Sequence, residues 1–149
     1  MNIKRFTDYS LRILIYLALK SKETSEAPVT IKEVADSYSI SKNHLMKVVQ
    51  ELSAKGYIRA TRGKNGGLKL GKAAKLINIG EVVRMTEQDS TLVECLGDNN
   101  HCVITPACEL KNILAKAKAC FFESLDQHTL ADLIKGKRSN ELKSILLFP

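Results

Sequence analysis

The sequence predicts a mainly α-helical fold with one small β-hairpin, organised as a winged helix-turn-helix domain followed by a long dimerisation helix. Three observations support this prediction. Two short helical segments meet at a tight turn, a glycine-rich hairpin follows them, and a long amphipathic stretch lies near the C-terminus. The chain has 149 residues, of which 44% are hydrophobic and 26% charged, so it can bury a core.

The first predicted helix covers residues 6–22, and its apolar residues occupy most of its circumference. This pattern is typical of a helix that is buried on all sides. A polar connector follows at 22–28. The second predicted helix covers 30–38, where Thr30 and Glu33 have the spacing of a capping box.

The third predicted helix covers residues 42–55 and follows a turn at 39–40. Ser41 is the expected N-terminal cap, and Gly56 is expected to end the helix in a left-handed conformation. A short helix, a tight turn and a second helix with a polar face together predict a helix-turn-helix.

A β-hairpin is predicted directly after this motif. Its strands are expected at 57–61 and 68–70, and its glycine-rich tip at 62–67 has the character of a wing. A fourth helix is predicted at 77–86.

A long helix is predicted to start at Thr105 and Pro106 and to reach about Leu125. A last helical turn is expected at 129–134, and residues 136–140 are expected to be polar and mobile. The long helix carries an apolar stripe that a small winged-helix body cannot cover, so we expect it to pack against its copy in a homodimer. The stripe consists of Leu110, Ile113, Leu114, Ala117, Phe121 and Leu125.

The predicted organisation therefore has four parts. Residues 1–86 form the winged helix-turn-helix domain, 87–108 a cysteine-rich loop, 106–128 the dimerisation helix and 129–149 a C-terminal segment. The chain carries no recognisable secretory signal, and its longest apolar run is too short to span a membrane, so a cytoplasmic protein is expected.

Positive charge is concentrated between residues 41 and 75. The chain has a formal net charge of +7, and this segment holds nine basic residues against the single acid Glu51. Such a surface favours a polyanion, double-stranded DNA first of all. The early residues of a recognition helix meet base edges, and a basic wing can reach phosphates or the minor groove. The candidate DNA-contacting residues are Thr30, Ser41, Asn43, His44, Lys47, Arg62, Lys64, Asn65 and Gly66.

Three cysteines, Cys95, Cys102 and Cys108, lie in one loop with the spacing C-x6-C-x5-C. In a reducing compartment, thiolates so grouped favour metal or cluster binding over disulfides. The loose spacing suits a cluster somewhat better than zinc. If the long helix is unbroken, Cys120 lies roughly 18 Å from Cys108, so we expect Cys120 to be a buried core thiol.

Three thiolates leave a fourth position open. The local candidates are Glu94, Asp98, His101 and Glu109, while Asp8 would have to come from the first helix. The spacing of the residues does not choose among them.

Several segments together resemble the Rrf-type iron–sulfur winged-helix transcriptional regulators, over nearly the whole chain, and most closely the nitric-oxide-sensing repressors among them. The matching segments are 6–12, 41–47, 62–67, 101–108 and 129–133. The resemblance implies that Cys95, Cys102 and Cys108 are iron–sulfur cluster ligands. It also implies that Asp8 of the other subunit supplies an oxygen ligand.

Further expectations come from the same resemblance. A related 2Fe–2S branch has a histidine three residues after its third cysteine, where this chain has Lys111, so 4Fe–4S is favoured and 2Fe–2S is the alternative. A homodimer would bind a palindromic double-stranded DNA operator and repress transcription. Nitric oxide would nitrosylate the cluster, release DNA and derepress genes for nitrosative stress.

The alternatives are a regulator that responds to iron–sulfur status or redox state, and a DNA-binding module with structural zinc. A cysteine-dependent enzyme is disfavoured, since no catalytic partner set is visible. The glycines at 63, 66 and 67 precede a strand rather than a helix, which argues against a phosphate-binding loop. No helix combines a basic face with large exposed apolar residues, so membrane binding is not expected.

Overall fold

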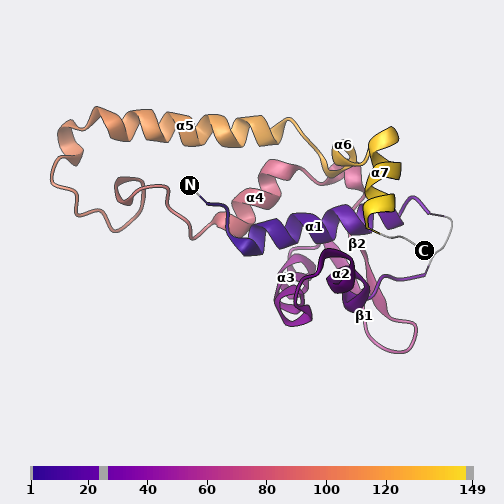
Figure 1. The fold of residues 1–149 in the computed structure, drawn as a ribbon. Coiled ribbons are helices and arrows are strands. Elements are labelled where there is room, and N and C mark those ends of the chain that lie inside the picture. The colour runs from indigo at the N-terminus through magenta and orange to yellow at the C-terminus, as the bar shows by residue number, and fades with distance from the viewer. Residues whose placement is uncertain (1, 24–26, 147–149) are drawn as a thin grey trace.

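The computed structural model describes residues 2–23 and 27–146 (Figure 1). Residues 24–26 of the predicted connector and the last three residues of the C-terminal segment lie outside this described part. The helices and strands are α1 (Arg5–Lys20), α2 (Ile31–Tyr38), α3 (Lys42–Ala54), β1 (Ile58–Thr61), β2 (Gly67–Leu70), α4 (Ile79–Glu87), α5 (Glu109–Asp126), α6 (Leu130–Leu133) and α7 (Lys137–Ile145). The predicted mainly helical fold with one hairpin is confirmed.

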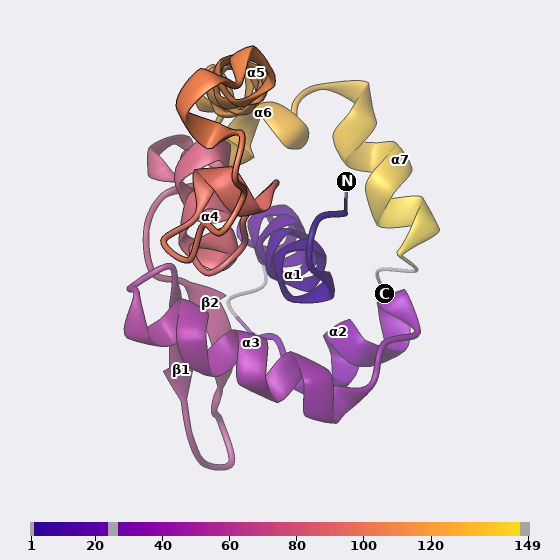
Figure 2. The ribbon, with the colours of Figure 1, turned by 90° about the vertical axis from the view of Figure 1, so that its left-hand side faces the viewer.

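Helix α1 is the centre of the molecule. Viewed along its axis, it is surrounded by the other helices (Figure 2), and it contacts α3, α4, α6 and β2. Ile13, Leu14, Ala18 and Leu19 have no exposed surface. The apolar circumference seen in the sequence is therefore explained by burial within one chain.

Helices α2 and α3 form the helix-turn-helix, with Ser39 left-handed at the turn (φ 53°). The Thr30 hydroxyl accepts the Glu33 N–H at 3.0 Å, as predicted. The reciprocal half of the capping box is absent, because the Glu33 carboxylate accepts from the Tyr16 hydroxyl at 2.8 Å instead. The prediction that the Ser41 hydroxyl caps α3 is also wrong. That side chain is exposed to water and makes no capping hydrogen bond.

The hairpin pairs β1 and β2 antiparallel, with Ile58 opposite Leu70 and Thr61 opposite Gly67. Gly56 is left-handed (φ 77°), as predicted for the end of α3. Val29 and Leu68 exchange backbone hydrogen bonds of 2.7 and 3.2 Å, which join the segment before α2 to the hairpin. This bridge fixes the wing relative to the helix-turn-helix.

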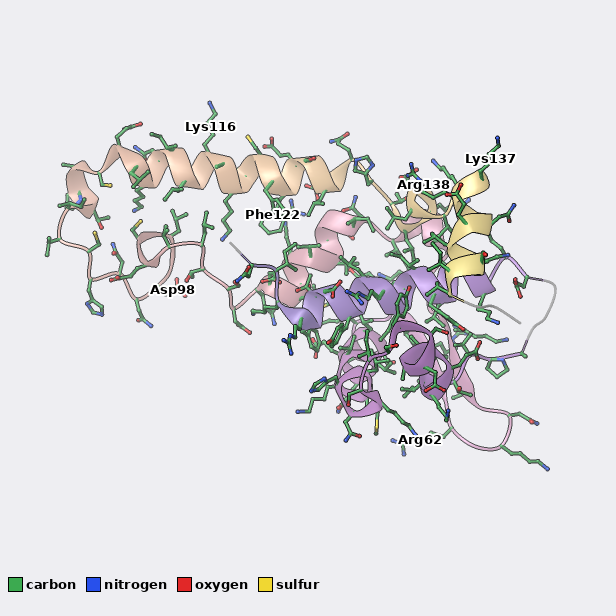
Figure 3. All side chains as sticks on the ribbon, viewed as in Figure 1. Arg62, Asp98, Lys116, Phe122, Lys137 and Arg138 are labelled. Carbon is green, nitrogen blue, oxygen red and sulfur yellow. The ribbon has the colours of Figure 1, made fainter. Side chains whose placement is uncertain are left out.

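Helices α4 and α5 meet at the C-terminal end of α5. Arg84 donates two hydrogen bonds of 2.6 Å to the Asp126 carboxylate, and this pairing lowers the pKa of Asp126. The Arg84 guanidinium also lies 4.8 Å from the centre of the Phe122 ring. Figure 3 shows Phe122 pointing from α5 toward the body of the protein and Lys116 pointing away. The body of the protein therefore holds α5 near its C-terminal end, and the 3-10 turn Glu94–Leu96 of the cysteine loop also contacts this helix.

Two predicted boundaries near the C-terminus are wrong. Thr105–Ala107 is a separate 3-10 turn, and α5 begins only at Glu109. The Thr105 hydroxyl donates to the Cys102 carbonyl at 2.8 Å, so it organises the loop instead of capping the helix. The segment 136–140, expected to be mobile, begins helix α7, in which Ser139 is buried, and Leu146 directly after the helix is buried as well.

No helix in the described part of the chain is long and apolar enough to cross a membrane.

The close approach of α4 to Asp126 makes Gly80 sensitive to substitution. A Cβ at residue 80 would lie 1.9 Å from Asp126 Oδ1, so we expect Gly80→Ala to reduce the free energy of unfolding. Overpacking costs about 1–3 kcal/mol, of which the better helix propensity of Ala recovers up to about 1 kcal/mol. Denaturant unfolding measures the change. The loss should shrink in an Asp126→Ala background, and equal losses in both backgrounds would contradict this account.

Candidate nucleic-acid interface and cysteine loop

Helix α3 separates a buried face from an exposed face. Leu45, Val48, Val49 and Leu52 are buried against the core. The predicted base-contacting residues of this helix and its cap all lie on the exposed side. They are Ser41, Asn43, His44 and Lys47. The helix thus presents a polar surface of the kind that enters the major groove.

The basic residues between 41 and 75 are exposed and are not neutralised by carboxylates, although the Lys72 ammonium lies 4.4 Å from the centre of the Tyr57 ring. All nine side chains are exposed, and none forms an ion pair with a carboxylate in the part of the chain that the structure describes. They are Lys42, Lys47, Lys55, Arg59, Arg62, Lys64, Lys69, Lys72 and Lys75. Unneutralised cations on one region of surface are what phosphate binding requires.

The wing lies on the same side of the molecule as α3, opposite α5 (Figure 1). Arg62, Lys64 and Asn65 are exposed there, and Figure 3 shows Arg62 at that edge. A Cβ at residue 66 would lie 2.2 Å from the Thr61 carbonyl oxygen, so the tight tip requires Gly66. Thr30, exposed at the start of α2, completes the predicted set. The structure therefore presents all nine candidates at the surface of the helix-turn-helix (α2 and α3), which we call the reader, or of its wing.

Helix α1 touches the recognition helix through aromatic side chains. The Tyr9 ring is stacked on that of His44, with 6.3 Å between centroids. The Tyr38 hydroxyl donates to the Arg12 carbonyl at 3.1 Å, and burial raises the pKa of Tyr38 to about 12, so the hydroxyl stays protonated. These contacts join α1 to both helices of the helix-turn-helix, α2 and α3.

Asp8, the candidate oxygen ligand, is paired within its own chain. Arg12 Nε donates to Asp8 Oδ1 at 3.0 Å, and Arg12 Nη2 lies 2.7 Å from Oδ2. Both side chains are about two-fifths exposed, so the pair is worth less than about 1 kcal/mol. Sequence reasoning missed this partner, although an acid and a base four residues apart in a helix are a recognisable signal.

The cysteine loop leaves α4 and leads into the N-terminal end of α5. All three cysteines have free thiols; Cys102 is exposed, and Cys95 and Cys108 are half-buried. The Glu94 carboxylate accepts the His101 N–H at 2.5 Å, and Asn100 Oδ1 accepts the Cys102 N–H at 3.0 Å. These bonds fold the loop back on itself, so Glu94 is engaged in shaping it.

The donor set fits a thiolate-bound group in its chemistry. Cys108 is the residue before the first turn of α5, and its thiol is free, like those of Cys95 and Cys102. Among residues 2–23 and 27–146, however, no three His, Cys, Asp or Glu side chains are gathered in a geometry that would hold a metal ion. The single chain brings the cysteines into one loop without closing them into a site.

Cys120 corrects a further prediction. Its thiol is exposed in this chain, not buried in the core. The prediction failed because the body of the protein covers a different side of α5: Leu114, Lys118 and Phe121 are half-buried, whereas Ile113, Ala117 and Cys120 are exposed. Phe121, Phe122 and Leu125 pack against the core there, whereas Leu110 and Ile113 are 58% and 57% exposed.

These features can be set beside known proteins. The Rrf2 family, described as iron-dependent transcriptional regulators, matches residues 3–136. The chain belongs to the Rrf2 family. It is therefore a DNA-binding transcriptional regulator.

Similar Rrf2-type proteins include two regulators from Bacillus, both named HTH-type transcriptional regulator NsrR. The protein from Bacillus licheniformis strain ATCC 14580 is 56% identical over 138 residues, which cover 92% of this chain and 94% of the relative. The protein from Bacillus subtilis strain 168 is 49% identical, with 92% of each chain covered.

Solved structures of Rrf2-type regulators confirm the fold. CymR, the global cysteine regulator of B. subtilis, has a TM-score of 0.70 and 30% identity, covering 89% of this chain and 95% of its own. IscR from T. potens has a TM-score of 0.69 at 23% identity, covering 90% and 86%. The arrangement of reader, wing and long helix is thus shared.

Two kinds of DNA contact should be separable by substitution. Asn43→Ala should weaken binding to a specific duplex by about 1–3 kcal/mol, because an amide can pair with an adenine edge. Lys72→Ala should weaken binding to all sequences alike. It should also make the slope of log affinity against log salt concentration shallower by about one. Binding curves at several salt concentrations, on specific and random duplexes, measure both. If Asn43→Ala lowers the affinity for the specific and the random duplex equally, the assignment of Asn43 as a base-reading residue is wrong.

Proposed function

We propose that this regulator is a transcriptional repressor, not an enzyme, and that an iron–sulfur cluster on its cysteine loop senses nitric oxide. The carrying observation is the position of Cys95, Cys102 and Cys108, on one loop between α4 and the N-terminal end of α5. A reaction at these thiolates can therefore move α5 relative to the reader. The similarity to proteins named NsrR supports the choice of signal.

The proposed ligands are the three cysteine thiolates and Asp8 of a partner subunit. Thiolates are the usual ligands of iron–sulfur clusters, and the donor chemistry of the loop fits this group. A 4Fe–4S cluster is preferred to a 2Fe–2S cluster, because Lys111 stands where a histidine ligand would be required. Bound there, the cluster would supply the iron with which nitric oxide reacts.

The proposed active form is a homodimer. Leu110 and Ile113 remain exposed on α5, and an apolar helix face of this kind is stabilised by burial against a second copy. Two readers related by twofold symmetry would bind a palindromic operator, with half-sites about one helical turn apart. Because the target is chromosomal DNA, we place the protein in the cytoplasm.

The side chains around Asp8 suggest how the signal reaches the reader. If Asp8 were to hold a cluster on the partner's loop, at least one of its oxygens would have to give up its contact with Arg12. Without that role, the carboxylate would pair with the Arg12 guanidinium as it does in this chain, and α1 would not be tied to the partner. The Tyr9–His44 contact then carries the displacement of α1 to α3. Genes for nitric-oxide detoxification are the expected targets.

An anaerobic titration tests the proposal. Visible absorbance and operator binding are followed on one sample as nitric oxide is added, and the chromophore should change in step with DNA release. Cys102→Ser should lose the chromophore, whereas Cys120→Ser, the matched control outside the loop, should keep it. A colourless protein that binds one zinc ion under reconstitution conditions, with DNA affinity indifferent to nitric oxide, would replace the sensor with a structural-zinc module.

The role of Asp8 is tested separately from the cluster itself. Asp8→Ala should retain a chromophore held by the three thiolates. The state of the cluster should no longer control DNA binding, so that DNA affinity responds much less to nitric oxide. Arg12→Ala, which removes the competing partner, should leave the coupling in place. An Asp8→Ala protein with a normal chromophore and normal nitric-oxide-driven DNA release would contradict the coupling.

A further inference from the structure

Helix α3 carries one large apolar side chain on its exposed face. Met46 is 50% exposed, whereas the other large apolar residues of the helix, Leu45, Val48, Val49 and Leu52, are buried. Exposure of Met46 in water has no structural benefit within the single chain. Its burial on binding DNA would be favourable.

Met46 lies in a row with two side-chain amides. Asn43 and Gln50 are exposed, and the spacing 43, 46, 50 places all three along one side of the helix. The other large exposed hydrophobics in the described part of the chain lie elsewhere. They belong to the segment before α1, the 3-10 turn at 74–76, the cysteine loop, α5 and α7. Met46 is therefore distinguished by its place on the nucleic-acid side.

The major groove offers one apolar group to such a residue. This group is the C5 methyl of thymine, while asparagine and glutamine amides pair with the N6 and N7 edge of adenine. A row of amide, thioether and amide thus matches a run of A·T pairs better than one of G·C pairs. The flexible methionine side chain can adapt to the exact position of the methyl group.

The geometry points to Met46 as a specificity-determining residue that packs on a thymine methyl in each half-site, flanked by adenine contacts from Asn43 and Gln50. Residues three or four apart on a helix have Cβ atoms about 5–6 Å apart, and stacked base pairs rise about 3.4 Å. Side chains of this length can therefore reach neighbouring base pairs. The inference rests on α3 being the recognition helix, which is part of the interface described above.

Removal of the methyl group alone tests this contact. The full-length dimer, reconstituted with cluster under anaerobic conditions, first selects a duplex from a random-sequence library. Each thymine of one half-site is then replaced singly by uracil, which keeps the pairing edge and lacks only the C5 methyl. One replacement should weaken binding about fourfold, the loss of about 0.8 kcal/mol expected for one buried methyl-sized group.

Protein variants then assign the effect to Met46. Met46→Ala should lower the affinity for the thymine duplex at least as much and should no longer distinguish thymine from uracil. Met46→Leu should retain part of the discrimination. Leu76→Ala is the matched control, because Leu76 is 65% exposed but lies in the 3-10 turn at Ala74–Leu76. It should leave the discrimination unchanged.

The outcomes separate this inference from the interface on which it rests. If Asn43→Ala weakens specific binding but no uracil replacement does, the methyl contact is wrong and the recognition helix stands. If the uracil effect persists in Met46→Ala, another residue reads the methyl group and the assignment is overturned. If neither Asn43→Ala nor Met46→Ala changes specific binding, α3 is not the base-reading helix and the interface itself is wrong.

Discussion

The burial of the apolar side chains of α1 is the constraint on which the rest of the structure depends. Ile13, Leu14 and Leu19 have no exposed surface, and each fully buried side chain of this kind contributes about 1.5–3 kcal/mol. Because α3, α4, α6 and β2 all pack on this one helix, none of them can move far without disturbing it. The same helix carries Asp8 and Tyr9 near its N-terminus, so the reader and the proposed sensory contact share one rigid element.

Much of the reader domain could be predicted because its signals are local. The Thr30 cap, the left-handed Gly56 and the glycine-rich wing each depend on a few neighbouring residues. The exposed face of α3 also followed from periodicity, since Leu45, Val48, Val49 and Leu52 fix which side is buried. Met46 was not identified as a candidate base contact, because an apolar residue beside such a stripe is easily counted as part of it.

The errors have a different physical origin, in contacts between distant segments. The Glu33 carboxylate binds Tyr16 and Lys20, which are far from it in sequence, and does not complete the capping box. Helix α7 was overlooked because the residues buried in it and directly after it, Ser139 and Leu146, give a weak apolar pattern. Its Lys143 also forms an ion pair with the distant Glu23 at 3.1 Å. Cys120 was placed in the core because periodicity shows that a face is apolar but not what covers it. The candidate ligand set could be named from one loop and one distant aspartate, but the described part of a single chain does not gather these residues into a metal site.

The attachment of α5 near its C-terminal end has a mechanical consequence. The helix is held at Asp126 by Arg84 and runs 18 residues to Glu109, a length of about 27 Å. A rotation of one degree about the held end moves the far end by roughly 0.5 Å over that length. Conversely, a shift of one or two ångströms at the cysteine loop would tilt α5 by only a few degrees about its attachment to α4. Under the proposed function, the length of α5 would therefore keep the change of helix angle small when the thiolates react.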